Sequence, residues 1–172
     1  MRFRGRCFRG LDPGWSFSPT SGEGARQTGG RFNPPGKAVL YLATAYDTAI
    51  GECAQGFGSR IPPLTLCEYD VDCEPVVDLS NDAGRDAAGV ELADLACPWK
   101  MLMDQGVPVP SWEVAQQMEV QGFAGMLVPS FFFGADARQV NLVVWNWSDR
   151  PPLMVKVHDP TGRLPKDRKS WE

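Results

Sequence analysis

Residues 29–52 read GGRFNPPGKAVLYLATAYDTAIGE, and this stretch sets the expected architecture of the chain. It opens with paired glycines, which permit a tight turn and a close approach of the backbone to a ligand. The run 38–43 is apolar and rich in β-favouring residues, so it predicts a strand. Thr44, with Asp47 three residues later, is a pattern that caps helices. The stretch therefore predicts a loop, a strand and a helix in direct succession.

The predicted helix carries an apolar stripe that we expect to face the core. The stripe recurs at helical spacing and consists of Tyr46, Ala49, Ile50, Cys53 and Phe57. Glu52 projects beside this stripe rather than within it. The helix thus presents a carboxylate next to its buried face.

Similar patterns extend outward from this stretch. Residues 2–8 alternate at period two, as in a strand with one buried face. Two further strands, 64–71 and 75–79, are close enough to form a hairpin. Between 86 and 122 the periodicity is helical, and Ser111 is expected to cap the last helix. Strand patterns return at 123–128, 140–147 and 153–157.

Strands near both ends and helices in the middle do not alternate as they do in a doubly wound sheet. With 172 residues, 43% of them hydrophobic and 22% charged, the chain has the size and composition of one compact domain. We therefore expect a single α+β domain. The tail after Asp159 is polar and is expected to be loosely held.

Composition also narrows the partners and the compartment. A formal charge of −4 leaves no excess of cations to bind a phosphate backbone, so nucleic acid is not an expected partner. No run is long enough to span a bilayer, and Arg2, Arg4 and Arg6 are not followed by the apolar segment of an export signal. The five cysteines contain no CxxC pair, which suits reduced thiols. We expect a cytoplasmic protein.

Several common site chemistries are absent from the sequence. His158 is the single histidine and lies near the C-terminus, which argues against a Ser-His-Asp triad and an HExxH zinc site. Gly30 and Gly36 enclose five residues where a P-loop needs four, and Ala38 stands where Ser or Thr would bind magnesium. No metal site is expected.

Three residues of the opening stretch have both a structural and a functional interpretation. Arg31 lies in a long irregular segment, 10–36, and is either a surface charge beside a turn or a guanidinium that grips a phosphate. Tyr41 either fills the core or stacks on a flat heterocycle. Glu52 is either an exposed helical residue or a carboxylate that stabilises oxocarbenium-like charge when a glycosidic bond breaks.

Two residues far along the chain are also open to two interpretations. Ser130 follows Val128-Pro129 where a strand ends, so its hydroxyl suits either a site or a turn. With no histidine nearby as a base, Ser130 is not an expected nucleophile. Asn141 either orients a loop through its amide or simply begins a strand.

Together these residues resemble the RES domain, a family named for an arginine, a glutamate and a serine in this order. Here the three fall on Arg31, Glu52 and Ser130. The surrounding segments agree, from residues 21–25 through Gly29-Gly30-Arg31-Phe32-Asn33 and Val39-Leu40-Tyr41-Leu42-Ala43 to Glu52, and later at Val128-Pro129-Ser130 and Asn141. Arg9, ahead of Asp12-Pro13, resembles the family's early arginine. The resemblance spans roughly residues 2–147, and we expect the domain at residues 1–157 with a polar tail at 158–172.

The resemblance implies a fold like that of ADP-ribosyltransferases, with two packed β-sheets, flanking helices and NAD⁺ bound between the sheets. It also implies a toxin of a bacterial toxin–antitoxin pair, blocked by an Xre-like antitoxin protein. Arg31 would hold the phosphates or the nicotinamide ribose of NAD⁺, Tyr41 would stack on nicotinamide, and Glu52 would stabilise the transition state. Ser130 would position the substrate, and Arg9 and Asn141 would complete the NAD⁺ site.

The acceptor of ADP-ribose stays open at this point. A target protein would make the chain a mono-ADP-ribosyltransferase, and we place this acceptor first. Phosphate or water would make it an NAD⁺ phosphorylase or glycohydrolase. A different class remains as an alternative, namely a non-catalytic module whose polar residues bind a nucleotide or a partner, or a scaffold in which Arg31 and Glu52 lie far apart.

Overall fold

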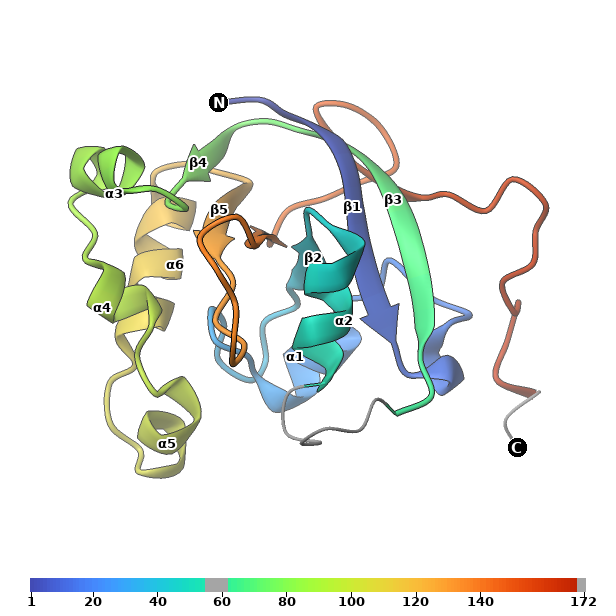
Figure 1. The fold of residues 1–172 in the computed structure, drawn as a ribbon, viewed down its shortest axis with the longest axis horizontal. Helices are drawn as coiled ribbons and strands as arrows, with labels where there is room; N and C mark the ends of the chain where they lie inside the picture. Colours follow the sequence, from blue (N-terminus) through green and yellow to red (C-terminus); the bar gives the residue numbers. More distant parts are fainter. Residues whose placement is uncertain (55–61, 170–172) are drawn as a thin grey trace.

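A computed structural model describes residues 1–54 and 62–169 and contains strands and helices in the α+β order expected (Figure 1). The strands are β1 Phe3–Leu11, β2 Leu40–Ala43, β3 Thr65–Cys73, β4 Val76–Asp78, β5 Gly125–Pro129, β6 Val140–Val144 and β7 Leu153–Val157. The α-helices are α1 Glu23–Thr28, α2 Tyr46–Ala54, α3 Asp82–Ala88, α4 Leu92–Leu95, α5 Trp99–Asp104 and α6 Pro110–Val120, and a 3₁₀ helix spans Pro13–Trp15.

The described strands form one sheet in the order β4-β5-β6-β2-β1-β3-β7. Adjacent strands are antiparallel except β4 and β5, which are parallel. The hairpin expected between 64–71 and 75–79 is therefore wrong. Its first strand, β3, has β1 on one side and β7 on the other, so no edge of β3 remains for β4. β4 pairs instead with β5, about fifty residues further along the chain.

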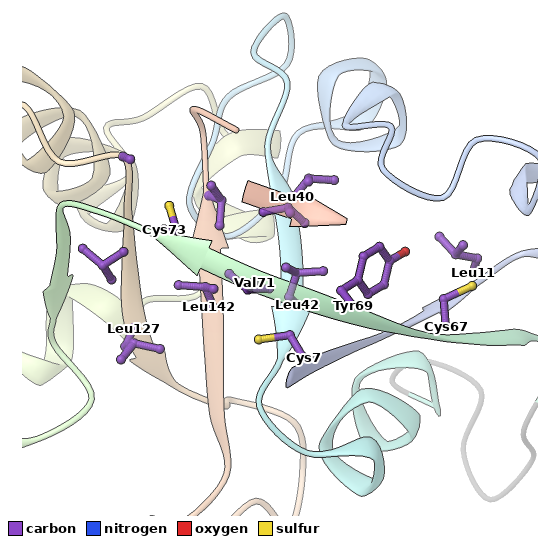
Figure 2. Packing of buried hydrophobic residues seen from close by; sticks show 14 residues of the cluster. Cys7, Leu11, Leu40, Leu42, Cys67, Tyr69, Val71, Cys73, Leu127 and Leu142 are labelled. Atoms are coloured by element: carbon purple, nitrogen blue, oxygen red, sulfur yellow. The ribbon is translucent and has the colours of Figure 1, made fainter. Parts of the chain in front are cut away.

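The two expected sheets are the two halves of this one sheet. A single pair, Phe8 with Ala43, joins β1 to β2, whereas β1 pairs with β3 along its full length. The β1-β3-β7 half can therefore bend over the β4-β5-β6-β2 half. Figure 2 shows β3 crossing β2 and β6, with side chains such as Leu42, Leu142 and Val71 in the layer between the strands. The α+β class with packed β layers is confirmed, in the form of one sheet folded on itself.

A second hydrophobic cluster covers the other face of the β5–β6 half. Met126, Val128 and Val143 of the sheet are fully buried there, against Met118 of α6 and Leu95 of α4. Helices α3 to α6 lie together beside β4 and β5 (Figure 1). Burying this apolar surface is what fixes the position of the helices relative to the sheet.

Helix α2 packs beside β1 and β2, and one part of its expected stripe is wrong. Ala49 is buried as expected, but Tyr46 is 62% exposed and makes an edge contact with the Phe8 ring. Tyr46 is the first residue of the helix, where the chain is still leaving β2, so its side chain points away from the core. Phe57, the last member of the stripe, lies outside the described residues.

The C-terminal tail makes specific contacts instead of being loosely held. The Asp159 carboxylate accepts hydrogen bonds from the backbone N–H groups of Arg163 and Leu164, and Leu164 packs against the core. Further on, the Arg168 guanidinium lies 4.2 Å from the centre of the Trp15 ring. One partly buried apolar residue, two backbone hydrogen bonds to Asp159 and one cation–π contact hold this polar segment on the domain.

Candidate active site

A cavity of about 440 Å³ lies where β1 and β2 separate. Five of the six predicted site residues line it, namely Arg9 of β1, Arg31, Tyr41 of β2, Glu52 of α2 and Asn141 of β6. The sixth, Ser130, contacts Glu52 directly. A scaffold with Arg31 and Glu52 far apart is thus excluded, because both side chains face the same cavity.

The loop that carries Arg31 is a tight turn, as the paired glycines predict. Gly29 has φ +71°, and the N–H of Gly30 donates to the carbonyl of Asn33 at 2.9 Å. A Cβ on Gly30 would lie 2.6 Å from the hydroxyl oxygen of Tyr41, so no larger residue fits here without displacement. The turn and the functional interpretation of Arg31 are therefore compatible.

Arg31 is half-buried, and neutral groups hold its guanidinium. Its Nη1 donates to the carbonyls of Leu95 and Cys97, at 3.2 and 2.8 Å, and its charge lies 4.7 Å from the centre of the Phe131 ring. Burial lowers the pKa of Arg31 from its usual range, and the nearby Glu52 opposes this shift. Because carbonyls orient an arginine without cancelling its charge, Arg31 keeps a positive charge for an anionic ligand.

Helix α6 fastens the backbone of the same loop. The Ser111 hydroxyl donates to the carbonyl of Arg31, and the indole Nε1 of Trp112 donates to the carbonyl of Gly30 at 2.8 Å. The expectation that Ser111 caps α6 is wrong, since the helix begins at Pro110 and Val109 is its N-cap residue. The Ser111 hydroxyl is committed to the loop instead of to its own helix.

The Tyr41 side chain reaches from the cavity into the Arg31 loop. Its ring lines the cavity, and its hydroxyl group is hydrogen-bonded within the loop. The hydroxyl donates to Oδ1 of Asn33 at 2.7 Å and accepts from the N–H of Phe32 at 3.0 Å. Burial raises the pKa of Tyr41 above its usual range. Asn33, fully buried, extends the network by donating from Nδ2 to the carbonyls of Ala25, Pro34 and Lys37. The ring of Tyr41 is thereby fixed in orientation.

Glu52 is half-buried and lies at the meeting point of three elements. Its Oε1 accepts hydrogen bonds from the Ser130 hydroxyl, at the end of β5, and from Nδ2 of Asn141, at 2.6 Å. Asn141 is placed by the sheet, where it pairs with Ala43 on one side and Val128 on the other. Two donors directed at one oxygen hold the carboxylate in one orientation.

Arg9 supplies a second cation to the cavity. Its Nη1 donates to the carbonyls of Pro19 and Ser21, at 3.2 and 3.0 Å. Burial lowers the pKa of Arg9. Among the described residues, the charged side chains that line the cavity are Arg9, Arg31 and Glu52, and their formal charges sum to a positive value.

The sequence interpretation missed three contributors to this site. Asn33 was part of the quoted loop but received no role, although a buried asparagine beside paired glycines is a common loop organiser. Phe131 follows Ser130 directly, and the run of three phenylalanines at 131–133 was a signal that went unused. Trp99 also lines the cavity, and no sequence signal marks it, since it lies just before the helix expected from 101.

The described residues contain no group of three or more His, Cys, Asp or Glu side chains arranged to hold a metal ion. They also contain no helix that is both long and apolar enough to cross a membrane.

Comparison with known proteins identifies the class. The family model of the RES domain matches residues 6–167, so this chain belongs to the RES domain family. Its fold is similar to that of a chain in the crystal structure of the M. tuberculosis MbcT–MbcA toxin–antitoxin complex, with a TM-score of 0.66 and 24% sequence identity. The match covers 92% of this chain and 84% of the other. The expected α+β fold is therefore confirmed, and it is similar to the fold of this matched chain. Comparison with curated protein sequences gives no match.

Proposed function

We propose that this chain is the toxin of a toxin–antitoxin pair, and that it cleaves the nicotinamide glycosidic bond of NAD⁺ and transfers ADP-ribose to a target protein. Membership in the RES family implies NAD⁺-consuming activity. The observation that carries the proposal is the Glu52 carboxylate, held by Ser130 and Asn141 in a cavity that also contains Arg31 and Tyr41. The cavity volume of about 440 Å³ lies within the range of small-molecule sites.

The chemistry requires stabilisation of positive charge on the ribose. When the bond between ribose C1′ and the nicotinamide nitrogen breaks, the electron pair leaves with nicotinamide and the ribose gains oxocarbenium character. A carboxylate already fixed in place stabilises that charge without rearranging during the reaction. Glu52 meets this requirement. The face of the Tyr41 ring, oriented through its hydroxyl, is suited to stack on the departing nicotinamide.

The two arginines suit the anionic part of the same substrate. The pyrophosphate of NAD⁺ carries two negative charges. One guanidinium group can bind two oxygens of a phosphate through two parallel N–H···O hydrogen bonds. Arg9 and Arg31 are both held by backbone carbonyls, which leaves their charges available. In our proposal Arg31 binds the pyrophosphate or the nicotinamide ribose, and Arg9 assists it.

A protein antitoxin is the proposed partner. The similar structure comes from a toxin–antitoxin complex, and the resemblance of the sequence implies an Xre-like antitoxin. The net charge of −4 leaves this chain no excess of cations to bind a phosphate backbone, so in our proposal the DNA contacts belong to the antitoxin.

The proposal is tested by product analysis. Purified protein is mixed with NAD⁺, phosphate and a cell lysate, and nicotinamide release is followed by chromatography. A labelled protein band identifies protein transfer, ADP-ribose-1″-phosphate identifies phosphorolysis, and free ADP-ribose identifies hydrolysis. Each of the last two would replace protein transfer with another acceptor. A complete lack of nicotinamide release would favour the non-catalytic binding module.

The variant Glu52→Gln isolates the role of the carboxylate. Loss of its negative charge should lower kcat for nicotinamide release by about 100-fold or more, in the range seen when a preorganised electrostatic group is removed. Glu113→Gln is the matched control, because Glu113 is exposed and lies outside the cavity. Equal rates for the two variants would remove Glu52 from the mechanism.

A further inference from the structure

Trp99 lines the active-site cavity, and within the described residues its ring takes part in no aromatic pair or cation–π contact. It is half-buried and belongs to neither hydrophobic cluster. The indole N–H groups of Trp112, Trp145 and Trp147 donate to backbone carbonyls, and no such hydrogen bond involves Trp99 in the described part of the chain. A half-buried indole usually finds a partner for its ring and its N–H. The position of Trp99 on the cavity wall suggests that its partner is a ligand.

The other aromatic side chains of the cavity wall already have contacts. Phe8 makes an edge contact with Tyr46, Phe32 contacts Phe131, and Phe131 lies under the Arg31 guanidinium. The ring of Tyr41 is fixed through its hydroxyl, which bonds Asn33 and Phe32, and it lines the same cavity as Glu52. Among the described aromatic residues of this wall, Trp99 is thus the one whose ring makes no aromatic or cation–π contact and whose polar group makes no hydrogen bond with the protein.

Trp99 is also linked to the proposed phosphate-binding arginine. The carbonyl of Cys97 accepts both the N–H of Trp99, at 2.8 Å, and Nη1 of Arg31, at 2.8 Å. One peptide group therefore positions the start of α5 and the guanidinium together. A ligand whose phosphate binds Arg31 would extend onto the wall that Trp99 provides.

From this arrangement we propose that Trp99 is the stacking platform for the adenine of NAD⁺, an assignment that rests on the proposed function. In NAD⁺ the pyrophosphate separates the nicotinamide ribose from the adenosine. With Glu52 and Tyr41 at the nicotinamide end and Arg31 at the pyrophosphate, the aromatic surface adjoining Arg31 faces the adenosine half. A flat indole recognises a purine through its π-face and needs no specific hydrogen bond.

The test compares NAD⁺ with nicotinamide mononucleotide, which has the same glycosidic bond but lacks adenosine. Trp99→Ala should lower kcat/KM for NAD⁺ about tenfold, mainly through KM, as expected for loss of one base-stacking contact. The value for nicotinamide mononucleotide should not change. Trp99→Phe should restore most of the loss, because it keeps an aromatic face. Met101→Ala, an exposed change on the same helix, is the control and should behave as the wild type with both substrates.

The outcomes separate this inference from the function on which it rests. An equal loss with both substrates would mean that Trp99 acts on the nicotinamide half or on stability, and would overturn the assignment. Wild-type kinetics of Trp99→Ala with NAD⁺ would also overturn it, while leaving NAD⁺ cleavage intact. Absence of nicotinamide release by the wild-type protein would instead refute the proposed function itself.

Discussion

The substitution Tyr41→Phe removes one oxygen atom and tests whether the hydroxyl of Tyr41 holds the Arg31 loop. The hydroxyl accepts from the N–H of Phe32 and donates to Oδ1 of Asn33. Phe32 is 3% exposed and Asn33 is 0% exposed, so water cannot readily replace the lost partner. A buried polar group left without a partner costs about 1–3 kcal/mol, and two such groups give a loss of about 2–6 kcal/mol. This is a large part of the stability of a typical domain.

Urea unfolding followed by circular dichroism measures this loss, and the chain offers a matched control. Tyr46 is 62% exposed, so Tyr46→Phe should change the free energy of unfolding by less than about 0.5 kcal/mol. Tyr41→Phe keeps its ring, so it should still release nicotinamide at high NAD⁺ concentration, with a raised KM because the Arg31 loop is less ordered. If Tyr41→Phe is as stable as Tyr46→Phe, the hydroxyl does not hold the loop and this reasoning is refuted.

Three other predictions follow from single contacts. Ser130→Ala removes one donor to the Glu52 carboxylate and should lower kcat about tenfold in a nicotinamide-release assay, since a hydrogen bond to a charged group contributes about 1.5–3 kcal/mol; an unchanged kcat would contradict this. Gly30→Ala places a Cβ 2.6 Å from the hydroxyl oxygen of Tyr41 and should destabilise the protein by about 1–3 kcal/mol in the same unfolding experiment, whereas an unchanged midpoint would show that the loop adapts. Burial raises the pKa of the Cys7 thiol from 9.0 to about 12, so the unfolded chain loses this proton first and the free energy of unfolding should fall as the pH rises above about 9. Cys7→Ala should reduce that slope by up to about 1.4 kcal/mol per pH unit, and equal slopes for variant and wild type between pH 9 and 11 would exclude the thiol.

Local sequence patterns predict the individual elements well and their pairing poorly. The strand at 38–43 and the helix after it follow from apolar periodicity within about ten residues, and the structure has β2 and α2 there. The hairpin at 64–79 was inferred from proximity in sequence alone. Its failure reflects competition for the edges of β3, which β1 and β7 occupy from opposite ends of the chain. Such competition depends on the whole sheet, so a short stretch of sequence does not reveal which strands will pair.

The residues of the candidate site also differ in how well the sequence predicts them. Arg31, Tyr41 and Glu52 lie within one stretch of the sequence, yet for each of them taken alone a structural role was the favoured interpretation. Ser130 and Asn141 were open to two interpretations until the resemblance to a family gave them a role, and the structure brings both to one oxygen of Glu52. Trp99 lines the same cavity, and the nearby carbonyl of Cys97 accepts a hydrogen bond from Arg31, 66 residues earlier in the chain, an interaction that no periodicity predicts.

The sheet itself explains why the cavity forms where it does. β1 and β2 share one residue pair, Phe8 with Ala43, and both of these residues line the cavity. Beyond this pair the two strands separate, as each half of the sheet turns to cover the apolar layer between them. Separating strands leave room beside the sheet and free backbone groups that need partners. Helix α2 fills part of this space, and Gly10 lies so close to it that a Cβ would be 2.3 Å from the sulfur of Cys53. That close approach brings Glu52, the residue before Cys53, to the opening between the strands. The bend that closes the core is thus the same feature that opens the site.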